Sequence, residues 1–365
     1  MLGAKKTGQE NDIKFPLVGA NNPTDSISSI CCNGFGNTAT TMLMATSWDC
    51  TVTCFEIQSN SQGQVNIVNR GQIRHDAPVL CSDISTDNIT AFSGGCDGAV
   101  KMWNVTQGPT AAQTIGTHEQ PVKCLKYMAD TKTLLTGSWD KTLKVWDLRQ
   151  PTPAATIQLS ERVYCMDTKG QAVVSVTADK QVSVFNITSG SKFSEFQSPL
   201  VYQPRCVSIF SNNLGFALGC IEGRIAIECF DELQYKKNQT GATLNKPKGS
   251  ENFAFKCHRD QNDIFSVNAI AFHPKNTFCS AGSDGVLSFW DKEARYKLSN
   301  FDQFKRVCPI TDVKFNEMGN YLFYSLSYDW SRGAENNEAK YGQNIYLHMV
   351  QPGEVTPKDK SLLKK

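Results

Sequence analysis

One short pattern, repeated seven times, constrains the fold of this chain more than any other feature. In each copy a small residue precedes an acidic residue, and a strand-like run with a polar end follows. The best copies are residues 94–104 (GGCDGAVKMWN) and 137–147 (GSWDKTLKVWD), and weaker copies surround Asp49, Asp179, Glu222, Asp284 and Asp329. Successive acidic residues are 39 to 48 positions apart, except for the 62 positions between Glu222 and Asp284.

Seven repeats of this length predict one closed ring of seven four-stranded sheets. A single sheet of this kind cannot bury both faces alone, so each must stack on its neighbours. The period and the Trp-Asp ending are typical of WD40 repeats. We therefore expect an all-β, seven-bladed WD40 β-propeller over residues 12–352, with an insertion at about 231–250. Residues 1–11 and the basic tail 353–365 are expected to be flexible.

The chain ends suggest how the ring closes. Residues 12–18 (DIKFPLV) form a candidate outer strand for the last blade, whose other strands are predicted at 310–315, 321–327 and 344–349. Pairing of this kind removes two exposed sheet edges. An outermost strand also tolerates Pro16, because it can lose one N–H partner.

Three repeats contain the residues of a hydrogen-bond network. Each acidic residue is placed in the turn between the second and third strands of its blade. There it is expected to bond a His from the turn that opens the blade, a hydroxyl on the second strand and a Trp indole on the third. The sets are His75, Ser93, Asp97 and Trp103; His118, Thr136, Asp140 and Trp146; and His258, Ser280, Asp284 and Trp290.

Two patterns invite an enzymatic interpretation, and both have a structural alternative. A His-Asp-Ser combination can belong to a hydrolase, but an active site is needed once, whereas these sets occur three times. Residues 34–39 (GFGNTA) match a dinucleotide-binding loop, which requires a strand before it and a helix after it. The run that follows is β-branched and apolar, so a hairpin turn is expected. We predict no enzyme, no cofactor and no metal.

Composition favours an intracellular protein with balanced charge. The chain has 37 Lys and Arg against 35 Asp and Glu, so no overall field draws it to nucleic acid or membranes. The N-terminus lacks the apolar core of a signal peptide, and no apolar run could span a bilayer. The fourteen cysteines lack paired ligand spacing and are expected to be reduced.

Two segments near the end of the chain carry a family resemblance. They are 253–259 (FAFKCHR) and 328–333 (YDWSRG). With most of the repeats, they resemble the mRNA export factor family of WD40 propellers, and less closely its spindle-checkpoint sister family. The first segment resembles both families, whereas the last blade favours the export factor. Arg332 stands where that family has Lys, which keeps the charge but changes its geometry.

The resemblance implies a scaffold that binds an acidic peptide hairpin of a nuclear pore protein and links messenger ribonucleoprotein to the pore. It also implies the nucleus and nuclear envelope as location, with the cytoplasm as a further site. The alternative is a mitotic spindle-checkpoint adaptor that binds kinetochore peptides. The predicted partner-binding residues, which mix cationic and aromatic side chains, are Arg259, Lys256, Trp330, Arg332, Asp329, Phe253 and Phe255.

Some of these residues also fit a purely structural role. Phe253 and Phe255 alternate with Ala254 and Lys256, as in a strand with one buried face. Trp330 is next to its turn acid, as Trp48 and Trp139 are next to theirs, which suggests packing. Direct contact with RNA would depend on local patches such as Arg295, Lys297, Lys305 and Arg306, and it would weaken steeply with salt.

Overall fold

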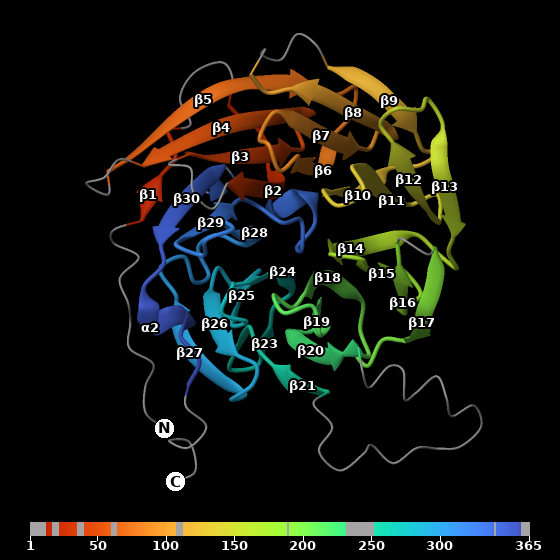
Figure 1. Cartoon of the computed structure of the whole chain (residues 1–365). Helices are drawn as coiled ribbons and strands as arrows, with labels where there is room; N and C mark the ends of the chain where they lie inside the picture. Colours follow the sequence, from red (N-terminus) through yellow and green to blue (C-terminus); the bar gives the residue numbers. More distant parts are fainter. Residues whose placement is uncertain are drawn as a thin grey trace, which may run out of the picture.

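Seven four-stranded antiparallel sheets surround a central axis in the computed structural model (Figure 1). The structure describes residues 12–16, 22–34, 40–59, 64–106, 112–187, 190–230, 252–338 and 341–358. The predicted all-β, seven-bladed propeller is therefore confirmed.

The blades follow one another along the chain. Blade 1 contains β2 (Ile27–Gly34), β3 (Thr40–Ser47), β4 (Thr51–Ser59) and β5 (Val65–Arg74); blade 2 contains β6 (Val79–Ile84), β7 (Thr90–Gly95), β8 (Ala99–Asn104) and β9 (Gln113–Thr117). Blade 3 contains β10 (Val122–Met128), β11 (Thr133–Ser138), β12 (Thr142–Asp147) and β13 (Pro153–Gln158); blade 4 contains β14 (Val163–Lys169), β15 (Ala172–Thr177), β16 (Gln181–Asn186) and β17 (Ser191–Gln197). Blade 5 contains β18 (Pro204–Ile209), β19 (Gly215–Cys220), β20 (Arg224–Cys229) and β21 (Phe253–Lys256); blade 6 contains β24 (Val267–Phe272), β25 (Phe278–Gly282), β26 (Leu287–Asp291) and β27 (Tyr296–Phe301). Blade 7 contains β28 (Ile310–Phe315), β29 (Tyr321–Leu326), β30 (Asn344–Met349) and β1 (Ile13–Lys14).

The N-terminal strand closes the ring as the sequence predicts. Red β1 lies beside blue β30 in Figure 1 and pairs with it antiparallel, with Ile13 opposite Leu347. The next residue, Phe15, is 1% exposed, and its ring contacts Phe55 of blade 1 and Phe323 of blade 7. The latch therefore includes a buried side chain as well as main-chain pairing.

The hydrophobic core is divided among the contacts between blades. One apolar cluster lies between each pair of neighbouring blades, including the pair formed by blades 7 and 1. Three aspartates on first strands also bond the next blade directly. Asp83, Asp167 and Asp312 accept the backbone N–H groups of Tyr127, Ile209 and Ile30 at 2.8–2.9 Å. These aspartates were not predicted to have this role.

The three predicted His networks form, with one correction to their wiring. In blade 3, His118 Nδ1 is 2.7 Å from the Asp140 carboxylate, and its Nε2 is 2.7 Å from Thr136 Oγ1. Trp146 Nε1 donates to the same hydroxyl at 2.8 Å. The His therefore lies between the acid and the hydroxyl, and the Asp does not bond the Trp as expected. Asp140 is thus connected to the Trp146 indole only through His118 and the Thr136 hydroxyl.

The network of blade 6 repeats this arrangement, and that of blade 2 repeats it without the Trp. His258 joins Asp284 and Ser280 at 2.9 and 2.8 Å, and the Trp290 indole donates to Ser280. His75 joins Asp97 and Ser93 at 2.8 and 2.7 Å. The Trp103 indole does not bond Ser93 as predicted, and its ring is buried in the core between blades 1 and 2.

The segments outside the regular repeats differ in part from expectation. Strands β2 and β3 pair antiparallel, and residues 35–39 between them, where a hairpin turn is expected, lie outside the described residues. The predicted insertion 231–250 and the segment 1–11 lie outside the described residues. A small two-stranded sheet, β22 (Arg259–Asp260) and β23 (Asp263–Ile264), precedes blade 6.

The folded region extends beyond residue 352, where the sequence analysis places the start of a flexible tail. Helix α2 (Pro352–Val355) packs on blade 6, and Glu354 and Val355 are 1% and 3% exposed. Thr277 Oγ1 donates to the Val355 carbonyl at 2.9 Å, and the Lys358 N–H donates to Asp291 at 2.7 Å. Apolar burial and these bonds fix the segment; residues 359–365 lie outside the described part.

Candidate docking face

One face of the ring carries most of the predicted contact residues. In an antiparallel meander the connections alternate between the two ends of the strands. The turns between second and third strands therefore share a face with the connections between blades, and we call this the network face because the His networks lie there. Arg259, Trp330 and Arg332 are all in such connections.

Arg259 is held at the surface by blade 5. Its Nη2 donates to the carbonyl and to Oε1 of Glu222 at 2.9 and 3.3 Å, and its side chain is 23% exposed. Nε also points to the Gly223 carbonyl at 3.5 Å. Nε and Nη2 are the only guanidinium nitrogens of Arg259 that bond other described residues. Nη1 can therefore donate to an acceptor outside the protein.

Trp330 belongs to an aromatic group that joins blades 7 and 1. Its ring centroid is 5.7 Å from that of Trp48 and 5.6 Å from that of Tyr328. Trp48 is 37% exposed, while the Trp330 indole N–H is buried and has no hydrogen-bond partner among the described residues. Arg332, two residues further on, is exposed. This group provides apolar surface beside a cation.

The Asp329 side chain is buried, unlike that of a partner-binding residue. It is 7% exposed and accepts hydrogen bonds from Asn268, Ser283 and the Ser331 N–H. Burial alone would raise the pKa of Asp329, but the charge of Arg205 and these hydrogen bonds lower it below its ordinary value. The side chain links blades 6 and 7, so its predicted partner contact is not supported by its position.

Phe253, Phe255 and Lys256 lie on β21, the outer strand of blade 5. The two phenylalanines are partly buried toward blade 6, and Phe255 lies 4.8 Å from Trp290. The Arg295 guanidinium stacks 4.4 Å above Phe253. Lys256 points outward and is exposed. The phenylalanines thus do not share a surface with Arg259, and the strand alternation correctly indicated their packing role.

Exposed apolar side chains mark the network face further, and sequence reasoning missed most of them. Ten large hydrophobic residues are exposed in the described part of the chain, and six occupy connections of this face. They are Trp48, Val201, Tyr202, Ile221, Ile264 and Val307. The signal was their position in connections between strands, where polar residues are expected.

The cations on this face are accompanied by carboxylates. Arg306 Nε and Nη2 donate to Asp260 and Asp263 at 2.9 and 2.7 Å, and Lys305 Nζ is 3.1 Å from Asp260. Hydrogen bonds from Lys305 and Arg306 lower the pKa of Asp260. Arg295 directly precedes β27, the outer strand of blade 6, and Lys297 is its second residue. The four cations suggested for RNA therefore do not form one patch.

A catalytic His, a metal site or a membrane-spanning helix would each require a particular arrangement of the described residues. The His residues of the three networks are 2–7% exposed and are bonded on both ring nitrogens. In the described residues no group of His, Cys, Asp and Glu side chains is placed to bind a metal. None of the described helices has the length and apolar character needed to cross a membrane.

Comparisons with known proteins agree with the fold and extend it to a family. The family described as WD domain, G-beta repeat matches residues 69–104, 110–147 and 249–291. The solved RRP9 WD40 repeats superpose with a TM-score of 0.69 over 95% of this chain and all of that one, at 16% identity, which supports the fold alone.

Relatives of known name match nearly the whole chain. Protein RAE1 of Arabidopsis thaliana is 45% identical, covering 98% of this chain and 97% of the relative. The mRNA export factor GLE2 of Chaetomium thermophilum is 39% identical, covering 96% and 95%. The mRNA export factor of Xenopus tropicalis is 37% identical, covering 99% and 95%. With identity at this level over the full propeller, this chain belongs to the mRNA export factor family of WD40 propellers.

Proposed function

We propose that this protein is a non-catalytic adaptor in the export of mRNA from the nucleus. In this role it binds an acidic, partly apolar peptide hairpin of a nuclear pore protein on its network face. The names of its relatives support the export role. The observation that carries the binding mode is the gathering of six exposed apolar residues with Arg259 and Arg332 on one face.

The chemistry of this face suits an acidic peptide with apolar side chains. Apolar residues of the peptide would cover Val201, Tyr202 and Ile264, and exposed apolar surface of this kind is typical of interaction sites. Carboxylates of the peptide would accept from Arg259 Nη1 and from Arg332. Charge-assisted bonds of this type contribute about 1.5–3 kcal/mol each.

Glu222 determines the charge that Arg259 presents to a peptide. Its carboxylate already pairs with Arg259 and approaches Arg224 at 3.4 Å. A peptide carboxylate would join this cluster rather than neutralise an isolated charge. The guanidinium is also fixed before binding, so little side-chain entropy is lost when the complex forms.

The test is binding of an acidic hairpin peptide to the full chain. Arg259→Glu should weaken binding by at least about tenfold, because it replaces an attractive contact with repulsion. Arg162→Glu is the matched control, since Arg162 lies on the same face between blades 3 and 4, is 51% exposed and pairs with Glu161. Equal affinities for these two variants, with unchanged melting temperatures, would contradict the proposed site.

The identity of the captured protein separates the two adaptor roles. Affinity purification from a nuclear extract should recover a nuclear pore protein with the wild-type chain and lose it with Arg259→Glu. Recovery of kinetochore proteins in its place would favour the checkpoint alternative.

A further inference from the structure

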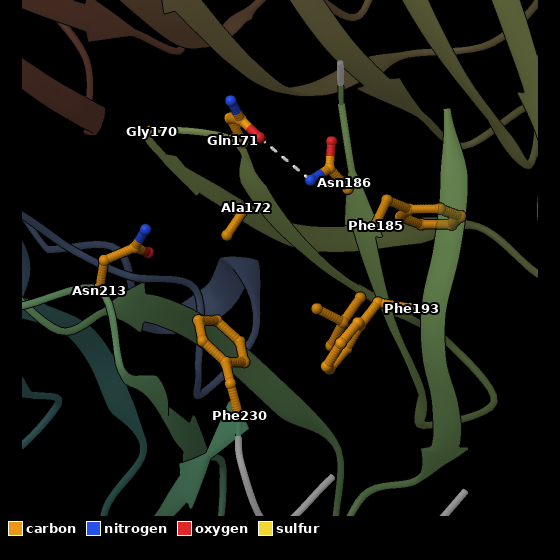
Figure 2. Close-up of a pocket in the computed structure, with 9 residues that line it drawn as sticks. Gly170, Gln171, Ala172, Phe185, Asn186, Phe193, Asn213 and Phe230 are labelled. Atoms are coloured by element: carbon orange, nitrogen blue, oxygen red, sulfur yellow. Dashed lines mark hydrogen bonds between the residues drawn. The ribbon is translucent and has the colours of Figure 1, made fainter. Parts of the chain in front are cut away.

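A cavity lies on the face opposite the network face, between blades 4 and 5. It has a volume of about 540 Å³, within the range of about 300–1,000 Å³ for ligand pockets. Figure 2 shows Ala172 and Phe193 of blade 4 and Phe230 of blade 5 around the open space. Three carboxamides, of Gln171, Asn186 and Asn213, surround it.

Aromatic rings form much of the cavity wall. Phe185 and Phe193 come from blade 4, and Phe230, the residue directly after β20, comes from blade 5. The Phe230 ring is 5.8 Å from that of Phe216 in the core between these two blades. A further aromatic ring can therefore pack against aromatic side chains here.

The lining specifies an uncharged ligand. Among the described residues no Asp, Glu, Lys, Arg or His contributes to the wall, so an ionised group would lose hydration there without a counter-charge. The Asn213 carboxamide makes no hydrogen bond to other described residues, while Asn186 Nδ2 donates to Gln171 Oε1 at 3.2 Å. Carboxamides both donate and accept, and can therefore pair with the N–H and C=O groups of a peptide backbone.

We propose that this cavity binds an aromatic side chain from an uncharged peptide segment of a partner protein. The ring packs on Phe193 and Phe230, and the carboxamides bond the adjoining backbone. Leu214, beside Asn213 and 59% exposed, extends the apolar surface at the mouth. Because this site and the network face are on opposite sides of the ring, the protein can hold two partners at once.

The probe is N-acetyl-tryptophanamide, the smallest neutral peptide-like molecule with an indole ring. Its binding to the full chain is measured by saturation-transfer NMR and by titration. Ala172→Phe, which fills the cavity, should weaken binding by at least about tenfold. N-acetyl-tryptophan, which differs by its free carboxylate, should bind at least about fivefold more weakly than the amide.

A matched pair of glycine variants tests the carboxamide without changing the backbone. Asn213 and Asn88 both have positive φ, 56° and 57°, in equivalent connections of blades 5 and 2. Asn213→Gly should weaken binding by about threefold, and Asn88→Gly should leave it unchanged, as should Arg259→Glu.

Two results would overturn the proposal. One is the absence of saturation transfer from the wild-type chain to N-acetyl-tryptophanamide. This result would mean that the cavity is closed or is filled by other residues of the same protein. The other is equal affinity of the wild type, Ala172→Phe and Asn213→Gly for the probe. Neither result bears on the network face, whose peptide binding is measured separately.

Discussion

The ring closure should depend on the charge of one buried histidine. His348 on β30 lies between two carboxylates: its Nδ1 is 2.6 Å from Asp12 of the N-terminal latch, and its Nε2 is 3.0 Å from Glu354 of α2. Tyr324 also donates to Asp12 at 2.7 Å. The cluster thus joins the start of the chain, the last blade and the C-terminal helix. Asp12→Asn removes one of its two carboxylates.

The size of the effect follows from the pKa of His348. Burial would lower this pKa, but the hydrogen bonds and charges of Asp12 and Glu354 outweigh burial and raise it to about 9. The ordinary value is about 6.5. A difference of about 2.5 units corresponds to about 3 kcal/mol of stability. Because the folded-state pKa is raised, this stability is fully present below about pH 6.5 and is lost as pH rises through about 9.

Urea denaturation between pH 6 and pH 10 measures this contribution. The wild type should lose about 3 kcal/mol of unfolding free energy over this range, and Asp12→Asn should lose about half as much, since only Glu354 still holds the proton. Asp87→Asn is the control, because Asp87 bonds Ser85 and Ile89 and lies away from His348. Equal pH slopes for the wild type and Asp12→Asn would refute the reasoning.

Two further predictions concern contacts inside and between blades. Thr136→Val leaves the Trp146 indole and His118 without their shared hydroxyl and should lower the free energy of unfolding in urea by about 2–4 kcal/mol. Ser175→Ala, at the equivalent position of blade 4, should be neutral or stabilising, because the buried Ser175 hydroxyl has no partner among the described residues. Similar losses for both variants would contradict the importance of the network. Gly116→Ala places a Cβ 2.2 Å from the Trp146 ring and should lower stability by about 1–3 kcal/mol, which a melting curve measures, and an unchanged melting temperature would show that the two blades are loosely packed there.

The repeat pattern predicted the fold because each repeat specifies its own local structure. The turn acids identified all seven blades, and the position of residues 12–18 identified the latch. The wiring inside each network was harder to predict, since it depends on distances across the blade. His118 bonds both Asp140 and Thr136, and Trp146 bonds Thr136. No sequence spacing shows that the His stands between the acid and the hydroxyl.

The docking face was predicted only in part, for a related reason. Strand alternation gives the direction of Phe253 and Phe255 but does not say which blade they meet. Asp329 reads as an exposed turn acid in sequence, yet Asn268 and Ser283 from blade 6 enclose it. These residues are 61 and 46 positions from Asp329. Such contacts arise from the stacking of neighbouring blades, and a single repeat does not reveal them.

The irregular blades show where a repeat protein can acquire a new surface without losing its ring. Blade 4 has Ser175, whose hydroxyl has no partner among the described residues, in place of the networked hydroxyl, and blade 5 has Leu218 and Glu228 in place of the hydroxyl and the indole. Blades 2, 3 and 6 keep their networks and stabilise their own turns. Because stability in a repeat array is roughly a sum of local terms, these three blades can compensate for the four that lack a network. The cavity between blades 4 and 5 can therefore persist and remain open to a side chain from a partner.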